Sequence, residues 1–96
     1  MATIGDLQAW YAAHCDGEWE HGYGVEISTL DNPGWSVEIN LKGTELAARP
    51  FNRISRGMGQ EETDWVTCWV ENETFQGRGG AQNLQEILDT FFTWAS

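Results

Sequence analysis

The sequence predicts an α+β domain, in which an antiparallel meander sheet of about five strands carries an N-terminal and a C-terminal helix. Three observations predict this class. Apolar residues recur at helical spacing near both ends of the chain, they alternate with polar residues in between, and the alternating segments follow one another after short connections. The expected order is α-β-β-β-β-β-α, and the length of 96 residues fits a single domain over residues 1–96.

The first helix is expected to begin after Thr3, where Asp6 stands three residues later and completes an acidic form of the capping box. Apolar and aromatic side chains then follow the i, i+3, i+4, i+7 spacing and predict one buried stripe. The stripe consists of Ile4, Leu7, Trp10, Tyr11, His14 and Cys15. Asp16-Gly17 is expected to end the helix, because glycine readily adopts the left-handed backbone that follows a last turn.

The clearest hairpin lies in the second quarter of the chain. Val25–Thr29 and Trp35–Leu41 each alternate apolar with polar residues. Asn32-Pro33-Gly34-Trp35 stands between them, and its proline and glycine predict a type II turn with Gly34 in the third position.

Three more strands are expected in the second half. A weaker third strand runs over Phe51–Arg56, and a strong fourth strand, rich in β-branched and aromatic residues, runs over Trp65–Glu71. Gly57-Met58-Gly59 and the acidic Glu61-Glu62 form the connection between these two strands. A short fifth strand is expected around Phe75.

Gly77-Arg78-Gly79-Gly80 is expected to break the fifth strand in a tight turn that needs positive φ. The segment lacks the lysine and hydroxyl of a nucleotide loop and the glycine spacing of a dinucleotide site. Asn83 then caps the last helix, with Glu86 at its third position. The apolar stripe of this helix is Leu84, Ile87, Leu88, Phe91, Phe92 and Ala95.

Fifteen acidic residues against five basic ones give a formal charge of −10, in a chain with six tryptophans. Such a field repels nucleic acids and anionic membranes and attracts a basic protein, so we expect neither nucleic acid nor membrane as a partner. Disordered acidic chains usually lack aromatic residues, so the tryptophans indicate a folded core. The same charge favours a monomer.

The compartment is expected to be the cytosol. Met1–Asp6 shows no basic region followed by an apolar stretch, and no apolar run approaches the roughly 20 residues of a membrane span. Cys15 and Cys68 are too few and too far apart for a disulfide framework, so both thiols are expected to be reduced.

His14–His21 contains both histidines and several potential metal ligands. Because no ligand pair has a zinc spacing, we expect a charged turn and no metal or cofactor. His14 is poorly placed as a base for Cys15, since neighbours on a helix point roughly 100° apart. The acidic surroundings would also raise the pKa of this thiol. We expect no catalytic residue, and the acidic groups Glu18/Glu20 and Glu61/Glu62/Asp64 are expected to form a solvated face.

The two faces of the sheet can be assigned in two ways. If Val66, Cys68 and Val70 face the helices, then Trp65, Thr67, Trp69 and Glu71 face away from them, beside Glu26, Glu38 and Asn40. That surface would combine acids with two aromatic anchors, as in a protein-binding hot spot. If instead Trp65 and Trp69 belong to the core, the fourth strand is turned over, and alternation alone does not choose between the two.

Short motifs spread over nearly the whole chain together resemble one protein family. They are Trp10-Tyr11, Cys15-Asp16-Gly17-Glu18-Trp19-Glu20-His21-Gly22-Tyr23-Gly24, Leu30-Asp31-Asn32-Pro33-Gly34-Trp35, Gly43-Thr44, Asp64-Trp65, Phe75 with Gly79-Gly80, and Asn83-Leu84-Gln85-Glu86-Ile87-Leu88. With these motifs the chain resembles the immunity protein 53 family of bacterial polymorphic toxin systems. The resemblance implies a small cytosolic α+β protein, made by a toxin-producing bacterium, that binds and neutralises a cognate toxin. It brings no catalytic residues with it.

The expected contact residues combine acids, which steer and pair with lysine or arginine, with aromatic side chains, which supply buried area. They are Glu18, Trp19, Glu20, Tyr23, Glu26, Glu38, Trp65 and Trp69. Because nucleases bind phosphates through basic active sites, the acidic charge predicts a basic, nuclease-type toxin. Two alternatives remain open: a small thiol- or metal-dependent enzyme using His14, Cys15 and His21, and a non-toxin interaction module such as a homo-oligomeric scaffold.

Overall fold

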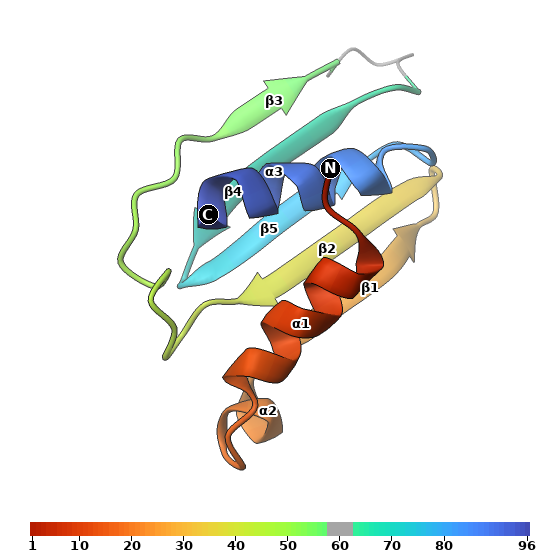
Figure 1. Cartoon of the computed structure of the whole chain (residues 1–96). Coiled ribbons are helices and arrows are strands. Elements are labelled where there is room, and N and C mark those ends of the chain that lie inside the picture. Colours follow the sequence, from red (N-terminus) through yellow and green to blue (C-terminus); the bar gives the residue numbers. More distant parts are fainter. Residues whose placement is uncertain (58–62) are drawn as a thin grey trace.

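The computed structural model describes residues 1–57 and 63–96. Its elements, in chain order, are α1 (Ile4–His14), α2 (Trp19–Gly22), β1 (Val25–Leu30), β2 (Gly34–Asn40), β3 (Ile54–Arg56), β4 (Val66–Glu71), β5 (Thr74–Gly79) and α3 (Leu84–Ala95). The strands form one five-stranded sheet, and Figure 1 shows α1 and α3 on the same face of it. The predicted α+β class, with an antiparallel sheet and a helix at each end, is confirmed.

The strand order is β1-β2-β5-β4-β3, and every neighbouring pair is antiparallel. A simple meander would have placed β3 beside β2, so the predicted meander order is wrong. The connection after β2 carries Leu41 and Leu46, which are both buried in the core. It leads the chain to the opposite edge of the sheet (Figure 1), and β5 then returns to the centre between β2 and β4.

The start of α1 is confirmed in detail. Thr3 Oγ1 accepts a hydrogen bond from the Asp6 N–H at 3.0 Å, and Asp6 Oδ2 accepts one from the Thr3 N–H at 2.9 Å. The predicted stripe is only partly buried: Leu7 lies in the core, whereas Ile4 is 59% exposed and Tyr11 is 39% exposed. One edge of α1 therefore presents apolar side chains to solvent. Gly17 has the expected positive φ, of 95°.

The β1–β2 hairpin is confirmed, but its turn differs from the prediction. Leu30 pairs with Gly34, so residues 31–33 form the loop and Gly34 is the first residue of β2. The predicted type II turn, with Gly34 at positive φ, is wrong. Glycine is needed there for space, because a Cβ atom would lie 2.4 Å from the carbonyl oxygen of Gly79 on β5.

The glycines before α3 also lie in a strand. β5 continues through Gly77, Arg78 and Gly79, so the predictions that this segment breaks the strand and needs positive φ are both wrong. A Cβ atom on Gly77 would lie 2.4 Å from Ile87 Cγ2. The missing side chains let α3 pack directly onto the backbone of β5.

The remaining strands are shorter than predicted. β3 covers only Ile54–Arg56, and β4 begins at Val66 rather than at Trp65. Phe51, which was expected in the third strand, packs its ring against Phe75 and Trp94, with centroids 5.7 and 5.2 Å away. The predicted connection through Met58, Gly59 and Glu61-Glu62 lies outside the described residues.

The core lies between the sheet and α3. Val37, Val66, Cys68 and Phe75 supply the sheet side and are at most 1% exposed. The predicted stripe of α3 covers them through its most buried members, Ile87, Leu88 and Phe91. Burial raises the pKa of the Cys68 thiol to about 11.

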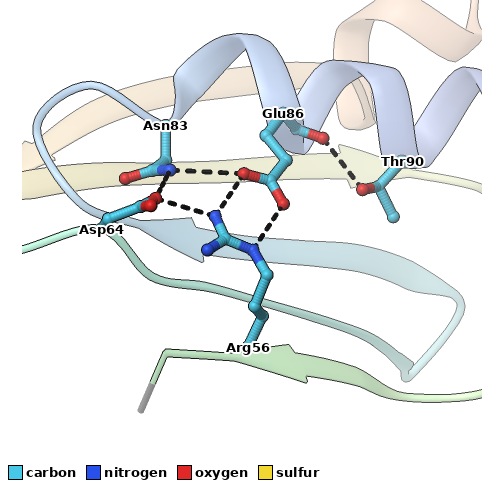
Figure 2. Close-up of polar contacts among 5 residues, drawn as sticks. All are labelled: Arg56, Asp64, Asn83, Glu86 and Thr90. Carbon is cyan, nitrogen blue, oxygen red and sulfur yellow. Dashed lines mark hydrogen bonds and ion pairs between the residues drawn. The ribbon is translucent and has the colours of Figure 1, made fainter. Parts of the chain in front are cut away.

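Polar contacts fasten the start of α3 to β3 (Figure 2). Asn83 precedes α3 as predicted, but its side chain makes no cap hydrogen bond. Its Nδ2 donates instead to Asp64 Oδ1 at 2.7 Å and to Glu86 Oε1 at 3.3 Å. Arg56, on β3, donates to Asp64 Oδ1 at 2.8 Å and to both carboxylate oxygens of Glu86. Thr90 Oγ1 donates to the Glu86 backbone carbonyl at 2.9 Å.

This cluster predicts an acid-sensitive contribution to stability. The Arg56 guanidinium lowers the pKa of Asp64 and of Glu86 below their ordinary values of 3.8 and 4.5. Stability from a carboxyl with a depressed folded pKa is present above the unfolded pKa and is lost as pH falls through the folded pKa. We therefore expect the urea midpoint of the wild type to fall more steeply below about pH 4.5 than that of Arg56→Met. Parallel pH profiles for the two proteins would contradict this assignment.

Candidate protein-binding face

Four side chains form a row across the face of the sheet that lies opposite α1 and α3. Glu26 on β1 pairs with Glu38 on β2, Glu38 pairs with Gln76 on β5, and Gln76 pairs with Trp69 on β4. Their strand neighbours Val37, Cys68 and Phe75 are buried beneath the helices. Because successive residues of a strand point to opposite faces, the row belongs to the other side of the sheet, which we call the open face.

Of the two assignments that the alternation left open, the structure selects the one with Val66, Cys68 and Val70 toward the helices. Glu26, Glu38 and Trp69 are therefore brought together, as predicted for that case. Trp65 is half-buried and stands directly before β4, and alternation from Val66 puts it on the open-face side.

Glu26 and Glu38 are two like charges in directly opposite positions of neighbouring strands. Such a pair is destabilising by itself. Arg78 relieves it on one side, because its Nη2 donates to Glu38 Oε2 at 3.3 Å and to Gln76 Oε1 at 3.1 Å. Within the described residues, the Glu26 carboxylate makes no hydrogen bond or ion pair. The row therefore presents a negative charge that the fold itself does not neutralise.

Trp69 is held between two guanidinium groups. The Cζ atoms of Arg53 and Arg78 lie 4.8 and 5.3 Å from its ring centroid, within cation–π range. Its Nε1 donates to Glu71 Oε1 at 3.0 Å. These contacts fix the orientation of a half-buried indole at the end of the row. A fixed aromatic side chain loses little conformational entropy when a partner covers it.

Every one of the five basic side chains contacts its own chain. Arg56 pairs with Asp64 and Glu86, and Arg49 donates to the carbonyl of Trp94. Lys42 Nζ lies 5.8 Å from the centroid of the Tyr23 ring, and the other two arginines are those at Trp69. Among the described residues, Arg56 and Arg78 form ion pairs with carboxylates, Arg49 donates to carbonyls, and Lys42 and Arg53 lie against aromatic rings.

Trp19 was expected at the contact surface, and its burial corrects that expectation. The side chain is only 6% exposed, and its Nε1 donates to the Lys42 carbonyl at 2.8 Å. Its ring lies 5.7 to 6.4 Å, between centroids, from the aromatic rings of Trp10, Tyr11, His14 and Tyr23. The acidic residues next to Trp19 in the sequence suggest an exposed position, but neighbours on the single turn of α2 point in different directions, so Trp19 can be buried.

The carboxylate of Glu20 also serves the fold. Its two oxygens accept hydrogen bonds from the backbone N–H groups of Asp16 and Gly17, each at 2.9 Å. Asp16 in turn accepts from the N–H groups of Trp19 and Glu18, and these bonds lower the pKa of its carboxyl. Of the four contact residues expected in this segment, Glu18 and Tyr23 are the exposed ones.

A hollow of about 380 Å³ joins Tyr23 to the row on the open face. Its wall runs from His21 to Glu26 and includes Glu38, Asn40 and Thr74. Three of the expected contact residues, Tyr23, Glu26 and Glu38, therefore share one depression. The open face is polar and acidic at this end, and at the other end Trp69 lies against the guanidinium groups of Arg53 and Arg78.

In the described part of the chain, the side chains of His14, Cys15 and His21 form no hydrogen bond with one another. His14 Nδ1 lies 2.8 Å from the Trp10 carbonyl, and its Nε2 lies 3.2 Å from Glu45 Oε2. Cys15 Sγ donates to the Tyr11 carbonyl at 3.3 Å, and His21 is exposed. Among residues 1–57 and 63–96, no cluster of three or more histidine, cysteine, aspartate or glutamate side chains could hold a metal ion.

Gln76, Arg78 and Arg53 are part of the open face, although they were not among the expected contact residues. Period-two alternation starting from Phe75 would have placed Gln76 and Arg78 there if β5 had been extended through the glycines. Arg53 precedes β3, and no sequence pattern brought it next to Trp69.

None of the helices in the described part of the chain combines the length and the apolar character that a membrane span requires. The family model described as Immunity protein 53 matches residues 4–96 of the chain. No curated protein and no solved structure shows a significant match to it.

Proposed function

The chain belongs to the immunity protein 53 family, and we propose that it binds and neutralises a cognate polymorphic toxin with a basic, nuclease-type domain. The contact surface of this proposal is the open face together with the adjoining hollow. Its residues are Tyr23, Glu26, Glu38, Trp65 and Trp69, to which we add the exposed Glu18 from the segment before β1. Trp19 packs against Tyr23, and Glu20 holds the backbone of Asp16 and Gly17 before α2.

The observation that carries the proposal is a difference between the two kinds of charged group: the basic side chains contact the protein itself, whereas several carboxylates do not. Each of the five basic side chains contacts its own chain, whereas the formal charge is −10. Among the described residues, the carboxylates of Glu18, Glu26, Asp31 and Glu73 make no hydrogen bond or ion pair. A surface with unpaired carboxylates favours a partner that brings lysine and arginine.

The arrangement suits occlusion of a phosphate-binding site. A nuclease holds its substrate through basic groups, and the two carboxylates of the row, those of Glu26 and Glu38, can meet such groups in place of phosphates. Neighbouring strands lie about 4.8 Å apart, so the row spans roughly 14 Å. Trp69 and Trp65 would add the buried aromatic area that gives such interfaces their affinity.

Binding accounts for these residues better than catalysis does. The polar atoms of His14 and Cys15 are engaged with Trp10, Tyr11 and Glu45. These contacts fix the end of α1 and the aromatic cluster around Trp19. No arrangement in the described residues favours a nucleophile with a base beside it.

The test is a calorimetric titration of the toxin domain encoded next to this gene, at about 50 mM and about 500 mM NaCl. We expect a one-to-one complex whose affinity falls at least about tenfold at the higher salt, because exposed charges more than a Debye length apart are then screened. The absence of a complex at low salt would refute the proposed function. An affinity indifferent to salt would refute the acidic surface as its cause.

A further inference from the structure

β1 is an edge strand of the sheet, and its outer side carries unpaired backbone groups. The Asn40 N–H donates to the Gly24 carbonyl at 2.9 Å, so Gly24 and Asn40 form a hydrogen-bonded pair. Hydrogen-bonded and non-bonded pairs alternate along an antiparallel ladder. The N–H and C=O groups of Val25, Ile27 and Thr29 therefore point away from β2, toward the open edge.

Two hollows of different character flank this edge. Toward α1, a hollow of about 220 Å³ is lined by Ile4, Leu7, Gln8, Tyr11 and Val25. Toward the open face lies the hollow of Tyr23, Glu26 and Glu38. Ile27, in the middle of β1, is itself 37% exposed. The edge thus has an apolar side and an acidic side.

Within the described residues, three carboxylates without a hydrogen bond or ion pair stand before, within and after β1. Glu18 lies in the segment before the strand, Glu26 lies within it and Asp31 lies in the turn after it. The other edge of the sheet is different, because β3 has only three residues, with Arg53 just before it and Arg56 at its end. A basic segment therefore finds a longer edge with unpaired carboxylates at β1, whereas the carboxylates beside β3 are already paired with Arg56.

We propose that β1 receives an extended strand of the toxin by β-strand addition, an inference that rests on the proposed function. Main-chain hydrogen bonds to Val25, Ile27 and Thr29 would hold the incoming strand. Because side chains alternate between faces, the strand would place apolar residues toward Ile4 and Tyr11 and lysine or arginine toward Glu26. A second copy of this chain fits less well, since β1 against β1 would bring unpaired carboxylates together.

The experiment compares Thr29→Pro with Thr29→Ala in binding to the neighbouring toxin domain. Thr29 is exposed and its N–H points outward, so proline removes one edge donor and leaves the ladder to β2 in place. We expect Thr29→Pro to bind at least about tenfold more weakly than the wild type, and Thr29→Ala to stay within about twofold of it. Equal affinities of the two variants would overturn the inference.

Hydrogen exchange on the wild-type protein gives a second readout that does not depend on how a variant folds. The amides of Val25, Ile27 and Thr29 should exchange rapidly in the free protein and become protected in the complex. A complex in which these amides stay unprotected overturns strand addition alone, whereas a wild type that forms no complex overturns the proposed function. A wild-type dimer that Thr29→Pro dissociates would assign the edge to a second copy and also overturn the inference.

Discussion

Replacing Glu26 and Glu38 together by glutamine is expected to weaken binding to the toxin domain about 10- to 100-fold. The two carboxylates lie opposite one another on the open face and share the hollow with Tyr23. Glutamine keeps the size of each side chain and removes the charge that we expect to meet lysine or arginine. Because like charges in opposite positions cost stability, the free energy of unfolding should change by less than about 1 kcal/mol.

A matched control separates the position of these charges from their number. Asp6→Asn with Glu45→Gln removes two charges outside the open face, one on α1 and one beside His14 at the end of α1, and gives the same formal charge of −8, which is −10 plus 2. Asparagine at position 6 keeps an oxygen that can accept the Thr3 N–H. We expect the control to bind within about threefold of the wild type, with the small loss arising from weaker long-range attraction. If both double variants lose affinity equally, net charge and not the row determines binding.

Gly77→Ala is expected to lower the free energy of unfolding by about 1–3 kcal/mol. The added Cβ would lie 2.4 Å from Ile87 Cγ2, so α3 would have to move away from the sheet over the centre of the core. Urea unfolding measures the change. Gly22→Ala is the control, because nothing lies within 4 Å of a Cβ atom at that position. A Gly77→Ala protein as stable as Gly22→Ala would contradict the close packing of α3 on β5.

The local elements could be predicted because neighbouring residues determine them. The capping box of Thr3 and Asp6 and the apolar stripe of α3 depend on spacing within one helix. Alternation along Val25–Thr29 and Trp35–Leu41 likewise predicts the first hairpin, which the structure forms from Val25–Leu30 and Gly34–Asn40. The strand order could not be predicted in this way, because the pairing of β2 with β5 joins residues far apart in the chain. Local periodicity carries no information about such contacts.

The predictions that differ from the structure at the first hairpin and at the end of β5 both concern glycines. The sequence pattern predicts positive φ at Gly34 and Gly77, whereas in the structure both residues allow other atoms to approach the backbone closely. Both uses require the absence of a side chain, so composition does not distinguish them. The error ended β5 too early and hid Arg78, the residue that contacts both Glu38 and Trp69.

The candidate site was predicted in part. Glu26, Glu38 and Trp69 share a face because period two holds along each strand, and burial of Val37, Cys68 and Phe75 shows which face that is. Trp19 could not be assigned from its acidic neighbours, because its burial depends on Trp10 and Tyr11 of another helix. A run of acidic residues in the sequence predicts an exposed segment, but the packing of the folded chain determines which aromatic side chains in that segment remain accessible.

The most direct test of the account measures the activity of the toxin domain during the titration with this protein. If the open face blocks the active site, toxin activity should fall in proportion to added protein and vanish at one equivalent, at low salt. The Glu26→Gln, Glu38→Gln double variant should need a large excess to reach the same inhibition. A toxin that remains fully active in a saturated complex, or that forms no complex, would contradict the claim that this chain neutralises it through its acidic face.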